Sequence, residues 1–217
     1  MIVTISGYPG SGKSTVGKML AKRWHCPYYS IGAIRRSMAR ERGMTLEEFN
    51  RYGESNFVTD RDVDAWQAKR GRELTTAVFE GRTAWHFIPQ SIKVFFTVDP
   101  KVGAKRIAED LAAHRRFEAN WTNLASVERA LSARIKSDSK RYRKYYRLNV
   151  FDRRHYDLII DTTKHRPHDT LRMIVKYLAN PVRGKSLNGA KVKQKTGTVR
   201  SLGIKNKLST GSKRRRK

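Results

Sequence analysis

Cysteine is nearly absent from this sequence of 217 residues, in which Cys26 is the only one. A single thiol excludes an intramolecular disulfide and any metal site that needs several cysteines. No apolar run approaches the ~20 residues that a membrane-spanning helix needs. The first expected strand begins at residue 2, where a signal peptide would otherwise lie. These absences favour a soluble protein in a reducing compartment, and we expect it in the cytoplasm.

Acidic residues are also scarce, since 19 Asp and Glu stand against 47 Lys and Arg and leave a formal net charge of +28. Asp169 is the last acidic residue, and residues 181–217 hold 13 Lys or Arg with no acidic and no aromatic residue. Such a segment cannot bury enough apolar surface to offset the entropy of ordering it. We therefore expect a folded domain over residues 1–180 and a disordered, basic, low-complexity tail over 181–217 that is drawn to polyanions.

The sequence does contain a complete phosphate-binding pattern, Gly7-Tyr8-Pro9-Gly10-Ser11-Gly12-Lys13-Ser14-Thr15. An apolar run precedes it and a helical pattern follows it, which is the context that such a loop requires. Backbone amides of the turn and of the helix N-terminus can surround an anion, Lys13 can reach the β and γ phosphates, and the Ser14 hydroxyl can bind Mg²⁺. The pattern predicts a nucleoside triphosphate site formed by Gly7, Gly10, Ser11, Gly12, Lys13, Ser14 and Thr15.

Apolar runs and helical patterns alternate up to residue 179, which predicts an α/β fold with a parallel sheet covered by helices. Strands are expected at 2–6, 27–31, 75–80, 92–98 and 156–161. Helices are expected at 13–24, 32–43, 45–52, 61–72, 101–115, 125–147 and 168–179. Thr45 and Glu48 have the spacing of a capping box. In a sheet of this kind the active site lies beyond the carboxyl ends of the strands, where the phosphate-binding loop also lies.

The third expected strand ends in Glu80-Gly81-Arg82, at the same edge of the sheet as the phosphate-binding loop. The Glu80 carboxylate can hold water ligands of Mg²⁺, and the Arg82 guanidinium can bind an acceptor phosphate as a fork. The alternative is a surface ion pair at a strand end.

Three further arginines, Arg106, Arg134 and Arg141, lie on two expected helices. Arg134 and Arg141 are seven residues apart and so share one face of a helix. Transfer between two phosphorylated molecules gathers many negative charges, which several arginines must neutralise. In a chain this basic, a solvated helix face is the alternative.

At this point the chain resembles the archaeal-type cytidylate kinases, a branch of the P-loop nucleoside-monophosphate kinases. The matching stretches run in order through residues 1–178. They are Ile5-Ser6-Gly7, Gly10-Ser11-Gly12-Lys13-Ser14-Thr15-Val16, Ser30-Ile31-Gly32, Arg35, Met38-Ala39, Glu41–Phe49, Asp60-Arg61, Val63-Asp64, Glu80-Gly81-Arg82, Arg106-Ile107-Ala108, Arg141-Tyr142 and Tyr156–Thr162. The stretches Gly43–Phe49 and Tyr156–Thr162 are the most specific to the family, whereas many NTPases share the phosphate-binding loop.

The resemblance implies a three-layer P-loop kinase fold with a five-stranded parallel sheet in the order 2-3-1-4-5. By the same resemblance, helices within 32–72 cover the monophosphate and the segment 109–147 includes a lid. The activity implied is transfer of the γ-phosphoryl group of ATP, with Mg²⁺, to CMP or dCMP.

The resemblance also implies roles for single residues. Lys13, Arg82, Arg134 and Arg141 would be catalytic, and Arg106 would meet the donor ATP. Glu80 would hold the metal through water, together with Ser14. The acceptor site would comprise Ser30, Arg35, Asp60, Arg61, Asp64, Gly81 and Arg82.

The basic tail keeps a second hypothesis open. A cationic segment without aromatic residues suits contacts to a phosphate backbone rather than stacking on bases. The alternative function is therefore a kinase-fold ribonucleoprotein component or ribosome-assembly factor, with kinase activity reduced or lost, that binds RNA through residues 181–217.

Overall fold

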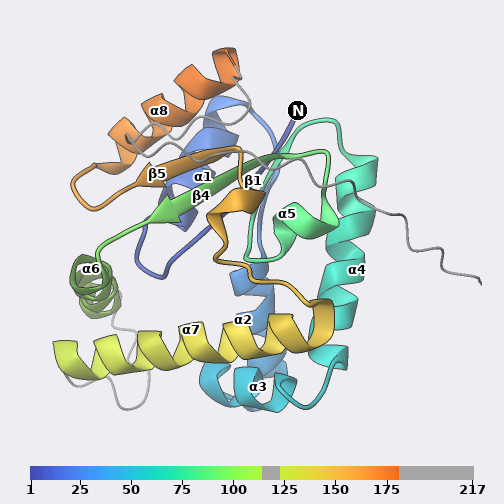
Figure 1. Ribbon diagram of the computed structural model, residues 1–217, viewed down its shortest axis with the longest axis vertical. Helices are drawn as coiled ribbons and strands as arrows, with labels where there is room; N and C mark the ends of the chain where they lie inside the picture. Colours follow the sequence, from blue (N-terminus) through green and yellow to red (C-terminus); the bar gives the residue numbers. More distant parts are fainter. Residues whose placement is uncertain (114–122, 181–217) are drawn as a thin grey trace, which may run out of the picture.

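The computed structural model describes residues 1–113 and 123–180, and these residues form a sheet with helices on both faces. The strands are β1 (Ile2–Gly7), β2 (Tyr28–Ser30), β3 (Ala77–Glu80), β4 (Ile92–Thr97) and β5 (Leu158–Asp161). They pair in parallel in the order β2-β3-β1-β4-β5, which confirms the order that the resemblance implied (Figure 1). Every residue of the central strand β1 is buried, as expected of a parallel strand covered on both faces.

The longer helices lie where the sequence pattern predicted them. They are α1 (Lys13–Arg23), α2 (Ile31–Glu41), α3 (Leu46–Gly53), α4 (Val58–Glu73), α6 (Pro100–Ala113), α7 (Leu124–Tyr146) and α8 (Pro167–Ala179). The capping box is present, because the Thr45 hydroxyl accepts from the Glu48 amide and the Glu48 carboxylate accepts from the Thr45 amide. Two short elements were not predicted, α5 (Ala84–Phe87) and the 3₁₀ turn η1 (Arg153–His155). Neither is long enough to show a hydrophobic period.

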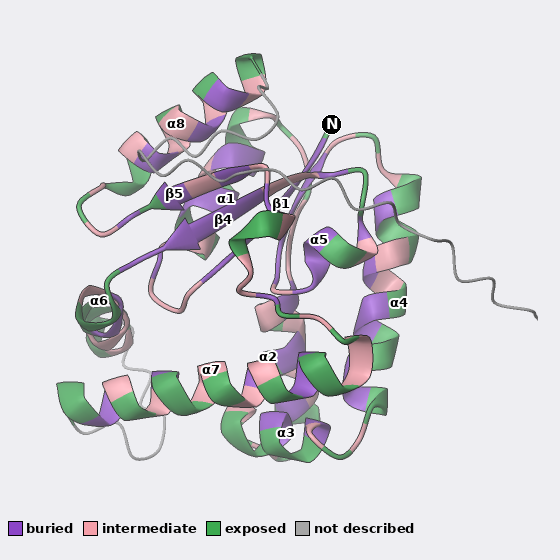
Figure 2. Ribbon diagram, in the orientation of Figure 1, coloured by how far each residue is buried: buried purple, intermediate pink, exposed green. Residues whose placement is uncertain are grey.

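Alternate residues of β1 face two different cores. Val3 and Ile5 pack with Leu20 of α1 and Ile174 of α8 on one face of the sheet. Ile2 packs on the other face, with residues of β3 and α5 and with Trp66 of α4. Strands β1 and β4 are accordingly drawn mostly in the purple of buried residues (Figure 2). The structure is therefore a three-layer arrangement of helix, sheet and helix, as the sequence predicted.

Helices α2, α3 and α7 lie together at one end of the molecule, at the bottom of the view in Figure 1. Helix α2 begins directly where β2 ends, and α7 packs against α6 through Ala104, Val127 and Leu131. The chain thus brings segments from residues 31–73 and 124–146 over the same edge of the sheet (Figure 1).

Several expectations fall outside the described residues. They concern the basic tail over 181–217 and residues 114–122 of the expected lid segment. Within the described ranges, no helix has both the length and the apolar character needed to cross a membrane.

Candidate active site

The phosphate-binding loop joins β1 to α1, and its basic side chain lies inside the loop. The Lys13 ammonium donates to the carbonyl of Tyr8 at 2.6 Å, and the Ser11 hydroxyl donates to the same carbonyl at 2.7 Å. Gly12 precedes α1 with φ 80°, in the left-handed region that favours glycine. The backbone therefore wraps around the Lys13 head group at the helix N-terminus, where an anion is stabilised.

A second glycine allows the loop to approach helix α6 closely. Gly10 has φ 71°, and a Cβ at this position would lie 2.2 Å from the carbonyl oxygen of Gly103. In turn, a Cβ at Gly103 would lie 2.9 Å from the carbonyl oxygen of Pro9. Two glycines that face each other thus set the distance between the phosphate-binding loop and α6.

Glu80, at the end of β3, accepts hydrogen bonds from three hydroxyl groups, one on α1 and two on β2. Its Oε2 atom accepts from Ser14 at 3.1 Å, from Tyr28 at 3.0 Å and from Ser30 at 2.7 Å. Burial opposes the charge, but the Lys13 ammonium and the three hydroxyl groups outweigh it and hold the pKa of Glu80 below its ordinary value. The sequence alternative of a Glu80–Arg82 ion pair is not what the structure shows, since Arg82 pairs elsewhere.

The charge of Lys13 is sensitive to its surroundings. Burial lowers the pKa of Lys13 to about 7, the Glu80 carboxylate raises it, and the guanidinium groups of Arg82 and Arg134 lower it further. Burial and neighbouring arginines disfavour the protonated form of a lysine, whereas a bound anion favours it. The site is thus electrostatically prepared for a highly charged phosphate group.

Three of the predicted arginines lie in one buried cluster, bridged by two carboxylates. Arg82 pairs with Asp138 at 2.8 Å, and Arg141 pairs with the other oxygen of Asp138 at 2.8 Å. Arg141 also pairs with Asp60 at 3.0 Å, and Asp60 pairs with Arg35 at 2.6 Å. The result is a continuous chain of alternating charges from the end of β3 through α7 and α4 to α2.

Asp138 is a member of this cluster that the sequence reasoning missed. Burial raises its pKa, but Arg82, Arg141, Arg134 and Arg35 outweigh burial and hold the pKa below its ordinary value. The signal was present in the spacing, because Asp138 lies four residues after Arg134 and three before Arg141 on one helix face. Asn50 was missed too, and its side-chain oxygen accepts from Arg35 at 3.1 Å and from Arg141 at 3.4 Å.

Asp64 lies one turn after Asp60 on α4, and its hydrogen-bond partners are uncharged, although the charges of Asp60 and Arg35 also act on it. Its Oδ1 accepts from Gln67 at 2.7 Å and from Thr83 at 3.3 Å, and its Oδ2 accepts from the Tyr146 hydroxyl. Burial raises the pKa of Asp64 to about 7. Asp60 and Asp64, both predicted for the acceptor site, thus differ in environment, since two arginines pair with the first.

The structure does not bring all predicted residues into the cluster. Arg61 is exposed and pairs with the neighbouring Asp62 at 3.0 Å. Arg106 donates to the backbone carbonyls of Thr162 and Thr163, at 2.9 and 3.1 Å, and so lies against the segment after β5. Thr15 is exposed on α1, next to Ser14.

The remaining predicted residues lie at the cluster or beside it. Gly7 has φ 143° at the end of β1, where a Cβ would meet the backbone of Phe96. Gly81, between Glu80 and Arg82, leaves space for Ile31 of α2. Arg134 is half-buried and close enough to Lys13 and Asp138 to shift their pKa values.

Glu54, just after α3, joins this part of the molecule to α7. Its carboxylate accepts from Ser137 at 2.8 Å and from Lys140 at 2.7 Å, and its carbonyl accepts from Lys144 at 2.7 Å. The preceding residue, Gly53, accepts from the Tyr145 hydroxyl at 2.8 Å. Four donors of α7 therefore hold the end of α3.

This arrangement suits chemistry on phosphate groups. One end of the sheet carries an anion-binding loop with Lys13, a hydroxyl–carboxylate pair of oxygen ligands at Ser14 and Glu80, and buried guanidinium groups. Guanidinium groups and a loop of this kind neutralise charge on a transferring phosphoryl group.

The chain is similar in sequence to known proteins over the residues that form the sheet and this site. Residues 2–164 match the profile described as the cytidylate kinase-like family. A cytidylate kinase of Methanocella arvoryzae is 36% identical over 166 residues, which cover 76% of this chain and 89% of the relative. A cytidylate kinase of Pyrococcus furiosus is 36% identical over 179 residues, with 81% and 86% covered.

Solved structures show the same fold at lower sequence identity. An uncharacterized protein from Eubacterium ventriosum superposes with a TM-score of 0.61 at 21% identity, covering 83% of this chain and 99% of that one. A shikimate kinase from Acinetobacter baumannii, in complex with shikimate, superposes with a TM-score of 0.53 at 17% identity, covering 84% and 95%. At these identities the likeness concerns the fold alone.

Proposed function

The chain belongs to the cytidylate kinase-like family, and on that premise we propose that it is an ATP-dependent kinase that phosphorylates CMP or dCMP. The donor is the γ-phosphoryl group of ATP, and the product is the corresponding diphosphate. The cytoplasm is the proposed site of action, since the single thiol of Cys26 suits a reducing compartment.

One observation carries the proposal, namely that the phosphate-binding loop and the buried arginine cluster meet at one edge of the sheet. Lys13 lies within the electrostatic reach of Arg82, Arg134 and Asp138. A kinase that transfers a phosphoryl group between two phosphorylated molecules needs both the loop and the arginines, whereas a protein that only binds an NTP needs the loop alone.

The four arginines divide between the acceptor phosphate and the transferring phosphoryl group. Arg35 and Arg82 would hold the acceptor phosphate, while Arg134 and Arg141 would reach the transferring group from α7. In the absence of phosphate, Asp60 and Asp138 supply the negative charge that these guanidinium groups need. A bound phosphate would compete with these carboxylates for the same donors, at little cost in desolvation because the arginines are already buried.

The transfer needs no covalent intermediate. In-line transfer depends on positioning and on charge neutralisation, and an arginine at the transferring group is worth about 10³–10⁵ in rate. Helices α2, α3 and α7 together would exclude water, which would otherwise accept the phosphoryl group.

Mg²⁺ fits the oxygen ligands at the loop. Ser14 and Glu80 present a hydroxyl and a carboxylate 3.1 Å apart, and Mg²⁺ prefers oxygen ligands of this kind together with water. When bound, the metal would neutralise charge on the β and γ phosphates. Ser14 would hold it directly and Glu80 through water, while Tyr28 and Ser30 keep the Glu80 carboxylate in place.

The proposal is tested by ATP-dependent phosphorylation of CMP, dCMP, UMP, AMP and GMP. We expect turnover of CMP or dCMP that is lost in Lys13→Ala. Lys18→Ala is the matched control, because Lys18 is an exposed lysine on the same helix with no part in the site. Folded, ATP-binding protein that turns over none of the five would overturn the proposal. An RNA contact through residues 181–217 stays a hypothesis that rests on their charge.

A further inference from the structure

Helix α7 has a buried face and an exposed face, and only the buried one carries residues of the proposed kinase site. Its buried residues include Leu131, Asp138 and Arg141, which face the arginine cluster and α6. The outer face carries a set of exposed cations, which we call the basic row. Its members are Arg129, Lys136, Lys140, Arg143 and, directly after the helix, Arg147.

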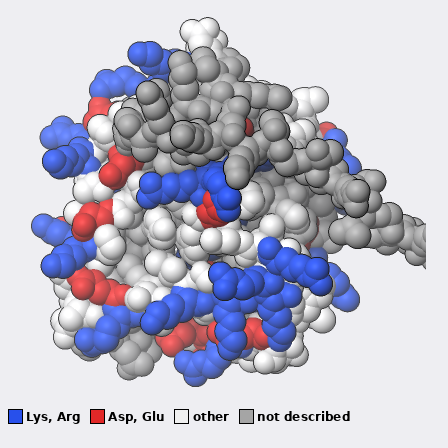
Figure 3. Space-filling view, viewed as in Figure 1, with Lys and Arg blue, Asp and Glu red and all other residues white. Residues whose placement is uncertain are grey.

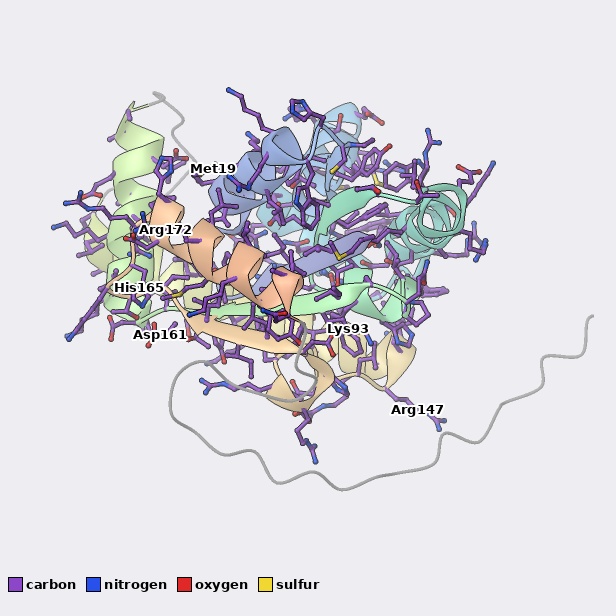
Figure 4. The ribbon with its side chains drawn as sticks, turned by 90° about the horizontal axis from the view of Figure 1, so that it is seen from above. Met19, Lys93, Arg147, Asp161, His165 and Arg172 are labelled. Atoms are coloured by element: carbon purple, nitrogen blue, oxygen red, sulfur yellow. The ribbon has the colours of Figure 1, made fainter. Side chains whose placement is uncertain are left out.

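The spacing of these residues places them on one line. Successive members are seven, four, three and four residues apart, so that the first and last differ by 18 residues, or about five helical turns. At 1.5 Å per residue the basic row is about 27 Å long. Figure 3 shows Lys and Arg side chains gathered along this part of the surface, and Figure 4 shows Arg147 pointing away from the body.

The basic row is poorly neutralised. Lys140 pairs with Glu54, although its side chain is still 70% exposed. Within residues 1–113 and 123–180, no carboxylate pairs with Arg129, Lys136, Arg143 or Arg147. The acidic residues of α7 itself are Glu128, to one side, and Asp138, on the buried face. Exposed like charges this close repel one another, so an isolated fold gains nothing from aligning them.

We propose that the basic row is a docking surface for the phosphodiester backbone of a nucleic acid. Each strand of a duplex carries one charge per ~3.4 Å of helix axis, so a row of about 27 Å spans about eight phosphates of one strand, more than enough to pair with each cation. The proposal is independent of the kinase reaction, because no member of the row belongs to the site.

The observations favour a nucleic acid over other polyanions. A helix that lies on a membrane turns apolar side chains toward the bilayer, whereas α7 turns Val127 and Leu131 inward against α6. An acidic protein would be bound by scattered pairs with an apolar centre. The basic row is instead narrow, linear and without an apolar centre, which suits a regular chain of charges.

The test uses the full-length chain and a fluorescently labelled 20-nucleotide single-stranded RNA, followed by fluorescence anisotropy between 50 and 200 mM KCl. The variant K136E/R143E/R147E reverses three members of the row that lack a carboxylate partner among the described residues. The control K18E/K22E/K176E makes the same change in net charge on α1 and α8, which pack on the sheet away from α7. Circular dichroism melting of both variants verifies that they are folded.

We expect the row variant to reduce the slope of log K against log salt by about 2, since each lost phosphate contact of a single strand contributes about 0.7. Its dissociation constant should rise by more than about tenfold at 50 mM KCl, with the control close to the unmodified protein. Equal losses in the two variants would mean that net charge alone binds RNA, and would overturn the proposal.

Two further arms identify the partner. A DNA strand of the same length reports whether the sugar matters, and tight binding of either nucleic acid through the row supports the proposal. Poly-glutamate at the same charge concentration represents an acidic protein. If poly-glutamate binds as tightly as RNA and is equally sensitive to the row variant, the surface is not specific for a phosphodiester backbone and the proposal fails.

Discussion

The ring of Tyr8, in the phosphate-binding loop, lies parallel to the ring of Phe151, with 5.1 Å between centroids and 8° between planes. The guanidinium of Arg82 lies 5.8 Å from the centroid of the same Phe151 ring. Phe151 therefore connects the loop for the donor to the arginine proposed to hold the acceptor phosphate, although it carries no charge itself.

This contact gives the first prediction. Phe151→Leu should lower kcat/KM for CMP by up to about 30-fold, because ring stacking and a cation–π contact contribute about 1 kcal/mol each and position two groups at once. Phe151→Tyr keeps the ring and should restore most of the activity. Steady-state kinetics measure kcat/KM of both variants, and thermal melting verifies that they are folded. If Phe151→Leu and Phe151→Tyr have equal kcat/KM, the ring does not position the site.

Replacing Gly10 should remove ATP binding with little loss of the fold. In Gly10→Ala, a Cβ would lie 2.2 Å from the Gly103 carbonyl oxygen, so the loop has to move. Gly43→Ala is the control, because Gly43 also has a positive φ of 65° but no atom within 4 Å of the added Cβ. We expect Gly43→Ala to cost about 1–2 kcal/mol of stability, Gly10→Ala to cost more but to stay folded, and only Gly10→Ala to abolish binding in isothermal titration calorimetry. ATP binding by Gly10→Ala at the unmodified affinity would contradict this account of the loop.

The pKa of Lys13 predicts a proton uptake on ATP binding. At about 7 in the free protein, this pKa leaves much of Lys13 neutral at pH 8, whereas bound phosphates favour the charged form. ATP affinity should therefore fall by up to tenfold per pH unit between pH 7.5 and 9, where the terminal phosphate itself has already lost its proton. Lys13→Arg, which stays charged, should show a flat profile. Calorimetry in two buffers of different ionisation enthalpy counts the protons, and a count of zero at pH 8 would refute the prediction.

Much of this site followed from the sequence, but its internal pairing did not. The loop over residues 7–15, the strand order and the capping box at Thr45 all depend on local patterns or on family resemblance, and the structure confirms them. That Arg82 pairs with Asp138 rather than with Glu80 depends on where α7 crosses the sheet edge. A contact between residues 56 positions apart has no local signature, and α5 and η1 were missed because each is only about one turn long and so cannot repeat a hydrophobic period.

Asp138 should be critical for stability. Asp138→Asn would leave Arg82 and Arg141 buried without this shared partner, and breaking a buried pair costs about 3–5 kcal/mol. Urea unfolding measures the loss. Inorganic phosphate should then stabilise Asp138→Asn more than the unmodified protein, because an anion can take the vacated place between the two guanidinium groups. Equal stabilisation of the two proteins by phosphate would show that the arginines are not available to anions.

Asp64 should make the protein less stable as pH rises. Its pKa is about 7 in the folded state, above the ordinary value of ~3.9 in the unfolded chain. The contribution of the protonated group is complete below about pH 4 and is lost as pH rises toward 7. Asp64→Asn lacks this titration, so its stability relative to the unmodified protein should improve between pH 4 and 8, by about 1.4 kcal/mol for each pH unit that separates the two pKa values. Urea unfolding at several pH values measures the difference in stability between Asp64→Asn and the unmodified protein. A difference that does not change with pH would contradict the raised pKa of Asp64.

The four bonds that α7 makes to Gly53 and Glu54 make α3 and α7 one mechanical unit. Any swing of the α3 end away from the sheet either carries along the helix with Arg134 and Arg141 or must first break these bonds. Access for an acceptor molecule and withdrawal of the arginines are then a single movement. The hinge for that movement must lie elsewhere, in the segments through which α3 and α7 join the rest of the chain.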